Sequence, residues 1–518
     1  MNRRTAAAAV LVVWVGALGW LVRREVLRPG SELLASAALS LPPGATYYMV
    51  FSGDAQIGFA STTIDTLPDT LRVTDVLALE VPVLGTLQRS DAQTEAILSR
   101  DLELRSFTAW LRSDNARFAA RGVVSGDTLL TVVVETGAAR DTLRLSLAQP
   151  ISLPSLLSLN VAFSGALEIG RTHTLQVFDP LQLAEREVRL TIEAESTFVF
   201  PDSAVFDSVV MRFVPVLWDT VQAWAARHGN GAAGLRTWVD RVGQIVHVTS
   251  PGGVTLERSA FELAYENFRR TAGQRRALAA SGTGRHDIVG QTAIASNVVL
   301  RPGNLRVLRV RLSGVELAGF DLDGGGQRLA GDTLIITRQP RSALRAAYTL
   351  RTPPGRLGAF MRAEPLIESD DPRIEAQARQ IIGRTRDPVE ATERLTAWVH
   401  QHLTKEVTLG VPSAVDVLAR RRGDCNEHTA LFVALARAVK IPTRIAAGLM
   451  HLDGAFYYHA WPEVWLDGEW VGVDPTFGQV PADAGHLRFT VGSLARQVEL
   501  LRLLGRLSLA VIDGPGGA

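Results

Sequence analysis

The chain has 518 residues, of which 47% are hydrophobic and 21% charged, and its formal net charge is +1 at pH 7. A chain of this length exceeds what one hydrophobic core supports, so we expect several folded domains and not a disordered protein. The near-neutral charge argues against a nucleic-acid-binding protein, and the single cysteine excludes intramolecular disulfides and cysteine-rich zinc sites.

An uncharged apolar segment lies near the N-terminus. Thr5–Val22 contains no charged residue and is flanked by arginine pairs on both sides. A helix of that length can just span the hydrocarbon layer of a bilayer. A cleaved signal peptide is the alternative, but the nearest small-residue cleavage motif, Ala35–Ala37, lies well beyond the segment. We therefore expect residues 1–24 to form a transmembrane anchor in the inner membrane, with the bulk of the chain periplasmic or otherwise extracytoplasmic.

Residues 45–268 consist of short β-branched and aromatic runs separated by turn sequences. Examples are TYYMVF, QIGFASTTID and DTLLTVVVET, with the turn Ser52-Gly53-Asp54 following the first. The segment Leu235–Val248 predicts a late hairpin that turns at Val242-Gly243. This pattern predicts a large, mostly antiparallel β-sheet domain outside the cytoplasm.

Two smaller segments follow. Residues 269–287 are rich in Arg, Ala and Gly and show little apolar periodicity, so they predict a linker that is helical in part. Residues 288–355 contain LRVLRVRLSG and DTLIITR, which predict a small β module. Its triple glycine, Gly324–Gly326, indicates a hairpin turn, since no helix that could form a phosphate loop opens after it.

Residues 356–518 have the pattern of an α+β domain. Segments 371–383, 387–403, 413–421 and 425–440 are predicted helices, and Asp387 before Pro388 forms a good helix start. Strands follow after Pro442, in TRIAAGLMHL, FYYHAWPEVWL and EWVGVD. Helices before an antiparallel sheet are typical of the α+β class.

The single cysteine falls at a predicted helix start, in RRGDCNEHTALFVALARAVKIP. Gly423 ends the preceding helix, Asp424 is a good N-cap, and Cys425 takes the first helical position. A helix N-terminus stabilises a thiolate, so we expect a lowered pKa for Cys425, and its free N–H groups could bind an oxyanion. The alternative is a buried cysteine that packs as a small apolar residue, but such residues usually lie in mid-helix.

A nucleophilic cysteine needs a base, and the base needs an orienting group. Asp467-Gly468 predicts a two-residue hairpin turn in AFYYHAWPEVWLDGEWVGVDPTFGQ. A regular register then places Trp461 opposite Asp474 and makes His459 the diagonal neighbour of Asp474 on the same face, within reach of a carboxylate. Individually, His459 could be an ordinary sheet residue and Asp474 an ordinary turn residue.

Two alternatives remain at this stage. His428, three residues after Cys425, lies on the same side of the helix and could act as the base, although no obvious carboxylate orients it. A metal site made by Cys425, His428, His459 and Asp474 is also conceivable, but the ligands are mixed and no ligand pair repeats. We therefore predict no metal and no cofactor.

The C-terminal part resembles the transglutaminase-like superfamily of papain-related Cys–His–Asp enzymes. The resemblance is carried by GDCNEHTALFVALARAVKIPTRIAAGL, YYHAWPEVWLDGEWVGVDPTFGQ and PADAGHLRF, and covers roughly Asp371 to Phe489. It implies that Cys425 is the nucleophile, His459 the general base and acid, and Asp474 the orienting carboxylate. No acidic cluster suggests the calcium sites of the animal cross-linking enzymes.

The resemblance implies thiol-dependent acyl transfer on amide or peptide bonds through a thioester. We expect hydrolysis more than cross-linking, because water is always present and no acceptor-amine site is evident. The expected partners are a protein or peptide substrate and, through the N-terminal helix, a membrane. The alternative function is a non-catalytic envelope protein for binding or assembly that uses the fold as a scaffold.

Overall fold

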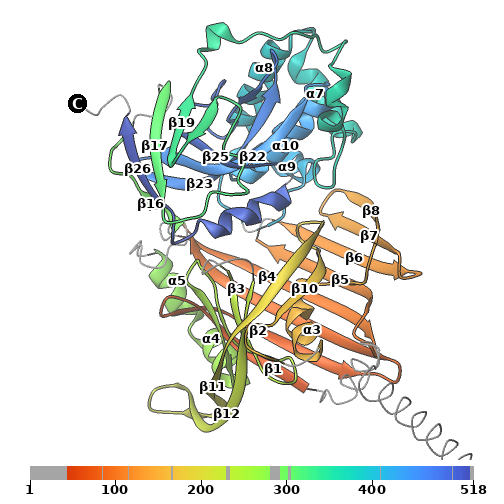
Figure 1. Cartoon of the computed structure of the whole chain (residues 1–518), viewed down its shortest axis with the longest axis vertical. Coiled ribbons are helices and arrows are strands. Elements are labelled where there is room, and N and C mark those ends of the chain that lie inside the picture. The colour runs from red at the N-terminus through yellow and green to blue at the C-terminus, as the bar shows by residue number, and fades with distance from the viewer. Residues whose placement is uncertain are drawn as a thin grey trace, which may run out of the picture.

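The computed structural model describes residues 44–83, 86–114, 116–164, 167–228, 234–280, 292–300, 305–408, 410–492 and 494–513. Within these ranges the chain forms one very large sheet in its first half and three smaller sheets with helices in its second half (Figure 1). The two halves touch, because the Asp416 carboxylate accepts the Gly137 N–H at 2.8 Å and Arg373 donates to the Ala138 carbonyl at 3.1 Å.

The first half is a sheet of 15 strands with the order β8-β7-β6-β5-β4-β3-β2-β1-β15-β14-β13-β12-β11-β10-β9. The strands are β1 (Gly44–Ser52), β2 (Ala55–Thr66), β3 (Thr70–Val83), β4 (Thr86–Ser99), β5 (Leu104–Ser113), β6 (Arg117–Ser125), β7 (Leu129–Thr136), β8 (Arg140–Ser146), β9 (Ile151–Ser152), β10 (Thr172–Asp179), β11 (Ala184–Asp207), β12 (Arg212–His228), β13 (Arg236–Val239), β14 (Ile245–Thr249) and β15 (Val254–Ser259). Apart from the parallel pair β9–β10, neighbouring strands are antiparallel, as predicted.

The large sheet is strongly curved, so strands far apart in the sheet order meet across its concave face. Phe107 on β5 lies 5.7 Å from Phe178 on β10, measured between ring centroids. A short 3-10 turn, η1 (Pro154–Leu156), and helix α3 (Leu157–Phe163) enter this concave space and bury Leu156, Leu157 and Leu159 against it (Figure 1). The predicted hairpin at Leu235–Val248 is confirmed as β13 and β14.

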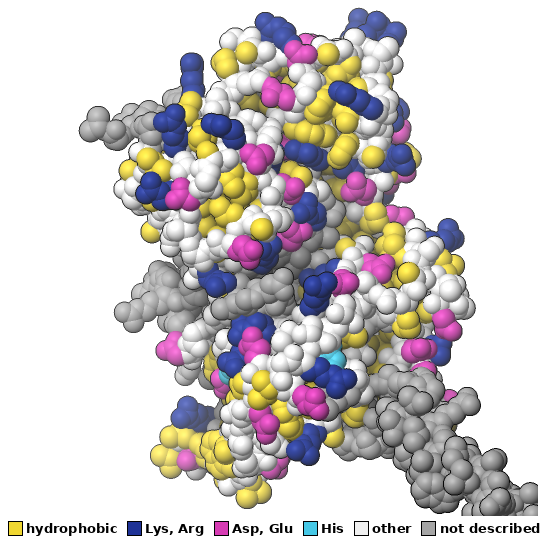
Figure 2. Space-filling view, viewed as in Figure 1, with side chains coloured by type: hydrophobic (Ala, Val, Ile, Leu, Met, Phe, Trp, Pro, Cys, Tyr) yellow, Lys and Arg dark blue, Asp and Glu magenta, His cyan; other side chains and the backbone are white. Residues whose placement is uncertain are grey.

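The far end of the long β11–β12 hairpin is apolar on its surface. Val209 is 89% exposed and Met211 63% exposed, and Val210 between them is also exposed. Figure 2 shows this end as a concentration of hydrophobic side chains at the edge of the molecule.

Short helices and a second group of strands follow the large sheet. The π-helix η2 (Glu262–Glu266) and α4 (Asn267–Arg270) extend from the end of the predicted β domain into the predicted linker, and α5 (Ala272–Ala280) lies within that linker, of which residues 281–287 lie outside the described residues. A four-stranded sheet has the order β18-β19-β17-β26, with β17 (Val307–Ser313), β18 (Gln327–Ala330), β19 (Thr333–Thr337) and β26 (Ser508–Asp513). The strand β26, to which the sequence assigned no role, pairs with β17 across nearly 200 residues of chain.

The last part is an antiparallel sheet with helices packed on it. The sheet has the order β16-β23-β22-β25 with β24 beside β23, where the strands are β16 (Ile294–Ala295), β22 (Thr443–Leu452), β23 (Ala455–Trp465), β24 (Trp470–Gly472) and β25 (His486–Gly492). The helices are α7 (Pro372–Ile382), α8 (Pro388–His402), α9 (Ala414–Arg420) and α10 (Cys425–Ala438), with 3-10 turns η4 (Arg341–Ala343), η5 (Gly355–Met361) and η6 (Leu494–Arg502). A two-stranded pair, β20 (Thr404–Lys405) and β21 (Arg422–Gly423), joins the loops before α10.

Helix α10 is the central helix of this domain. Its residues from Ala430 to Ala436 are completely buried, and they form one core with the inner faces of α7, α8 and α9. The predicted start of α8 is confirmed, because Asp387 accepts the Val389 N–H at 2.9 Å and Pro388 occupies the first turn.

One element of the predicted architecture is wrong. The prediction included a transmembrane helix and inner-membrane anchoring, but no helix among the described residues is long and apolar enough to cross a bilayer. The segment on which this prediction rested, Thr5–Val22, lies outside the described residues.

Candidate active site

The start of α10 holds the single thiol in a fixed position. The Asp424 carboxylate accepts the Asn426 N–H at 2.8 Å, and the Glu427 carboxylate accepts the Asp424 N–H at 2.9 Å, which completes a capping box. Cys425 is the first residue of the helix, as predicted. Gly423 is required here, since a Cβ at that position would lie 2.3 Å from the Cβ of Glu427.

The surroundings of Cys425 raise its pKa, so the predicted lowering is wrong. Burial raises the pKa of the Cys425 thiol well above its usual value, and the carboxylates of Asp424 and Glu427 add to the shift. A backbone hydrogen bond from Ala460 acts in the opposite direction without cancelling it. Cys425 packs, with Tyr458, against the apolar core that includes Leu449 and Phe456, and the residue as a whole is half-buried. In the resting protein the sulfur therefore carries its proton.

The hairpin register predicted from Asp467-Gly468 is confirmed. Trp465 pairs with Trp470 and Glu463 pairs with Gly472, and the Val473 N–H donates to the Pro462 carbonyl at 2.9 Å, so the predicted register holds as far as Pro462. His459 then lies diagonal to Asp474, and its Nε2 is 2.9 Å from Asp474 Oδ2. His459 is 7% exposed and Asp474 is completely buried.

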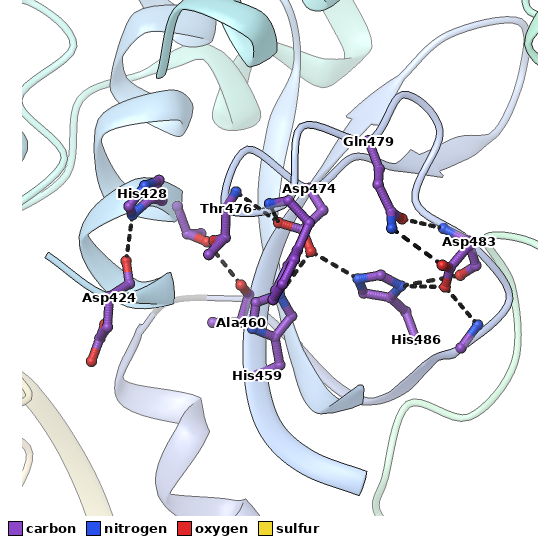
Figure 3. A network of polar contacts seen from close by, with 12 residues as sticks. Asp424, His428, His459, Ala460, Asp474, Thr476, Gln479, Asp483 and His486 are labelled. Carbon is purple, nitrogen blue, oxygen red and sulfur yellow. Dashed lines mark hydrogen bonds and ion pairs between the residues drawn. The ribbon is translucent and has the colours of Figure 1, made fainter. Parts of the chain in front are cut away.

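Asp474 is the centre of a buried polar network (Figure 3). Its Oδ1 accepts the backbone N–H groups of Thr476 at 2.8 Å and Phe477 at 3.1 Å. Its Oδ2 is shared by two imidazoles, His459 Nε2 and His486 Nε2, each at 2.9 Å. Burial alone would raise the pKa of Asp474, but the charges and hydrogen bonds of the two histidines outweigh it and hold the pKa well below its usual range. Asp474 is therefore ionised.

Sequence reasoning missed His486. This residue begins β25, and its other ring nitrogen, Nδ1, lies 3.2 Å from Asp483 Oδ1 and 3.1 Å from the Asp483 carbonyl. Burial by itself would lower the pKa of His486, but hydrogen bonds to Asp474 and Asp483 raise it to about 9. The spacing Asp483-x-x-His486 was the available signal, since a carboxylate three residues before a histidine can hold its ring. His486 is thus a cation at neutral pH.

The alternative base, His428, is bonded to the backbone of its own helix cap and not to a carboxylate. Its Nδ1 lies 2.7 Å from the backbone carbonyl of Asp424, its own helix cap, and the side chain is completely buried. Burial lowers the pKa of His428. No hydrogen bond among the described residues joins His428 to a carboxylate, so the orienting group that a base requires is missing there.

A metal would have to be held by His459, Asp474 and His486, whose ligand atoms all lie within 4.8 Å of one another. Both imidazole nitrogens are instead at hydrogen-bonding distance from the same carboxylate oxygen. Cys425 and His428 do not belong to this group, so the four-residue metal site considered from the sequence does not form.

Helix α10 brings Cys425 beside the strand that carries His459. Thr429, one turn along α10, donates to the carbonyl of Ala460 at 3.0 Å, and the backbone of Ala460 also bonds the Cys425 sulfur. Ala460 follows His459 directly, so the thiol lies next to the histidine in the fold. The structure has no direct hydrogen bond between the described side chains of Cys425 and His459. Catalytic contacts are often longer in an unliganded enzyme than in its complex with substrate.

A segment near the C-terminus also reaches the start of α10. Gln497 in η6 donates to the Asn426 side-chain oxygen at 3.0 Å. Asn426 follows Cys425, so the terminal stretch to which the sequence assigned no role packs beside the thiol.

Comparisons with known proteins agree with the motifs. Residues 375–475 match the family model of the transglutaminase-like superfamily. No curated protein matches the chain. Among solved structures, similar ones include a candidate cysteine protease of Cytophaga hutchinsonii (18% identity, 43% of this chain and 87% of that one, TM-score 0.27) and the periplasmic domain of TgpA from Pseudomonas aeruginosa bound to ethylmercury (17%, 37% and 92%, TM-score 0.25).

A third similar structure is a β-barrel-like protein of the DUF1849 family from Brucella abortus, with 14% identity over 42% of this chain and 95% of that one and a TM-score of 0.26. At these scores the three structures carry no argument about activity. The family model supports one assignment, and the capped helix α10 and the hairpin of β23 and β24 agree with it. Residues 375–475 form a transglutaminase-like domain.

Proposed function

We propose that this protein is a cysteine-dependent enzyme that cleaves amide or peptide bonds through a thioester. Cys425 is the nucleophile, His459 the general base and acid, and Asp474 the group that orients His459. The observation that carries the proposal is the buried hydrogen bond of 2.9 Å between His459 Nε2 and Asp474 Oδ2, on the strand beside the capped thiol. Because Nε2 of His459 is bonded to Asp474, Nδ1 is the ring nitrogen that can take a proton from the sulfur of Cys425.

The first half of the reaction forms the thioester. Cys425 Sγ attacks the carbonyl carbon of the substrate while its proton passes to His459 Nδ1. The tetrahedral intermediate collapses with cleavage of the C–N bond, and His459 returns the proton to the leaving amine. Because the pKa of Cys425 is raised, proton transfer must accompany attack and does not precede it.

The second half returns the free enzyme. Water attacks the thioester and gives one proton to His459, the C–S bond breaks, and the sulfur takes the proton back as the carboxylic acid leaves. Asp474 keeps its charge throughout, since the imidazolium of His486 lies on the same oxygen and stabilises the carboxylate. His459 therefore stays oriented in both protonation states.

The helix start supplies one donor for the oxyanion. The capping box already uses the N–H groups of Asn426 and Glu427. The N–H of Cys425 is the donor in this first turn that the cap does not use, so we propose it as the donor that binds the oxyanion.

Hydrolysis is proposed ahead of cross-linking, with a protein or peptide as substrate. The carboxylates of Asp424 and Glu427 lie close to the thiol. Beyond these two, the described residues contain no acidic cluster that resembles the calcium sites of the animal cross-linking enzymes. An extracytoplasmic location remains part of the proposal, based on the arginine pair followed by the uncharged segment at the N-terminus.

The test uses the full-length chain and a library of unlabelled peptides in water enriched in heavy oxygen, with mass spectrometry of the products. Wild-type protein should introduce the heavy isotope into new carboxyl groups, and Cys425→Ala should not. His459→Ala should be nearly as inactive, and Asp474→Ala should retain some activity. His428→Ala is the matched control and should stay active. Equal turnover by wild type and Cys425→Ala would remove the enzyme proposal, and loss of activity in a folded His428→Ala protein would overturn the choice of base.

A further inference from the structure

A cavity of about 470 Å³ lies inside the curved sheet, far along the chain from the thiol. Strands β1 to β4 line one side, strands β11 to β15 the other, and the segment η1–α3 covers it with Ser155, Leu157 and Val161. The lining is mostly apolar. This volume is within the range of small-molecule binding sites.

One row of side chains breaks the apolar face of the sheet. Thr62 on β2, Asp75 on β3 and Thr94 on β4 lie directly opposite one another. The rows on both sides are apolar, namely Ala60–Leu77–Ala92 and Ile64–Val73–Ala96. Asp75 is the only carboxylate among the described residues that line the cavity. A single carboxylate between apolar rows lowers the stability of the domain, because burial removes its hydration. Such a residue is therefore a candidate for ligand binding.

Three polar atoms around this row do not meet the geometry of a hydrogen bond with any described residue. They are Asp75 Oδ2, the Tyr48 hydroxyl and Ser155 Oγ, although Thr62 lies close enough to Tyr48 to lower its pKa in part. Asp75 Oδ1 is satisfied by the Thr62 hydroxyl at 2.6 Å, so only its second oxygen is available. Tyr48 is 2% exposed and lines the cavity. Buried polar groups are almost always paired, so three free ones around a cavity indicate a ligand.

The charge of Asp75 is set by its surroundings. Burial raises its pKa to about 6, which the Thr62 hydroxyl opposes. Ser155 also lowers the pKa, although its hydroxyl does not meet the geometry of a hydrogen bond with Oδ2. Asp75 is therefore mainly a carboxylate at neutral pH, which accepts hydrogen bonds and repels anions.

We propose that this cavity binds a small amphipathic molecule whose apolar body fills the space beneath α3 and whose hydroxyl or amine head donates a hydrogen bond to Asp75 Oδ2. The hydroxyls of Tyr48 and Ser155 complete the polar end of the site. An acidic head would have to bind elsewhere in the lining, at Arg186, but this guanidinium already forms an ion pair with Asp179 at 3.8 Å. We therefore assign the head group of the ligand from Asp75 and not from Arg186.

Calorimetric titration of the full-length chain tests this with three probes that differ only in the head group: decanol, decylamine and decanoate. Decanol and decylamine should bind with one site per chain, and decanoate should not. Asp75→Asn should weaken decylamine binding by about tenfold to a hundredfold, the range for one hydrogen bond to a charged group. Asp65→Asn, an exposed acid on the neighbouring β2 strand, is the matched control and should bind as wild type does.

A second variant separates the cavity from the acid. Ala60→Phe places a ring in the space beside Tyr48 and should abolish binding of both probes while the circular dichroism spectrum stays unchanged. The proposal is overturned if none of the three probes binds, if decanoate binds best, or if Asp75→Asn and Ala60→Phe bind decylamine as wild type does. Cleavage activity at Cys425 does not enter this experiment, so its outcome is independent of the proposed function.

Discussion

Replacing His486 by glutamine should remove a specific pH dependence of stability in the transglutaminase-like domain. In the folded protein the pKa of His486 is raised from 6.5 to about 9 by Asp474 and Asp483. A raised pKa means that the folded state binds the proton more tightly than the unfolded state does. The resulting stabilisation is complete below pH 6.5 and disappears as the pH rises through about 9.

The magnitude follows from the two pKa values. Linkage between 6.5 and about 9 gives a loss of about 2 kcal/mol in the free energy of unfolding between pH 6.5 and pH 8.5. The buried histidines with lowered pKa, such as His428 and His451, are neutral in the folded protein, but their unfolded forms lose protons near pH 6.5, so each adds a small stability change of opposite sign. The difference between wild type and His486→Gln therefore isolates His486.

Hydrogen exchange of α10 peptides, followed by mass spectrometry and corrected for the intrinsic pH dependence of exchange, measures the opening free energy of this domain alone. Wild-type protein should lose about 2 kcal/mol across the interval, and His486→Gln should be nearly flat. His451→Gln is the control, since His451 is also buried in this sheet but has no carboxylate partner of this kind. The same pH slope in wild type and His486→Gln would refute the assignment of a charged His486.

Three further predictions follow from the geometry. Alkylation of Cys425 by iodoacetamide should be slow at neutral pH and rise only above pH 9, because its pKa is raised; fast labelling at pH 6 would contradict this. Gly423→Ala should destabilise the start of α10 by about 1 kcal/mol or more, measured by urea unfolding, while Gly358→Ala, with open space around it, should have little effect. Arg488→Met should cost about 1.5–3 kcal/mol in the same measurement, since it removes one charged hydrogen bond of 2.9 Å from Glu463, which keeps Arg444 as a partner, whereas exposed Arg328→Met should be near neutral.

The parts of the site that depend on short stretches of sequence could be predicted. Asp424 before Cys425 specifies a helix start through a local cap, and Asp467-Gly468 specifies the register that brings His459 to Asp474. Both follow from turn and cap chemistry within about ten residues. The order of strands and helices in the domain follows from the same kind of local pattern.

The parts that depend on distant packing could not be predicted. The second imidazole on Asp474 comes from β25, and β25 reaches the site by pairing with β22, which no turn specifies. The pKa of Cys425 depends on how deeply α10 is buried, whereas the sequence shows only that the thiol lies at a helix end. The size of the curved sheet likewise depends on pairings such as β1 with β15, which join residues more than 200 positions apart.

The pairing of β26 with β17 has a consequence for how the protein is made. Leu509 and Val511, among the last described residues, lie in the same core as Leu308 and Val310. A growing chain therefore exposes one edge of β17 until β26 has been made, nearly 200 residues later, and the sheet β18-β19-β17-β26 can close only at that point. A variant that lacks Ser508–Asp513 should therefore give a lower yield of folded protein, although Cys425 itself is unchanged.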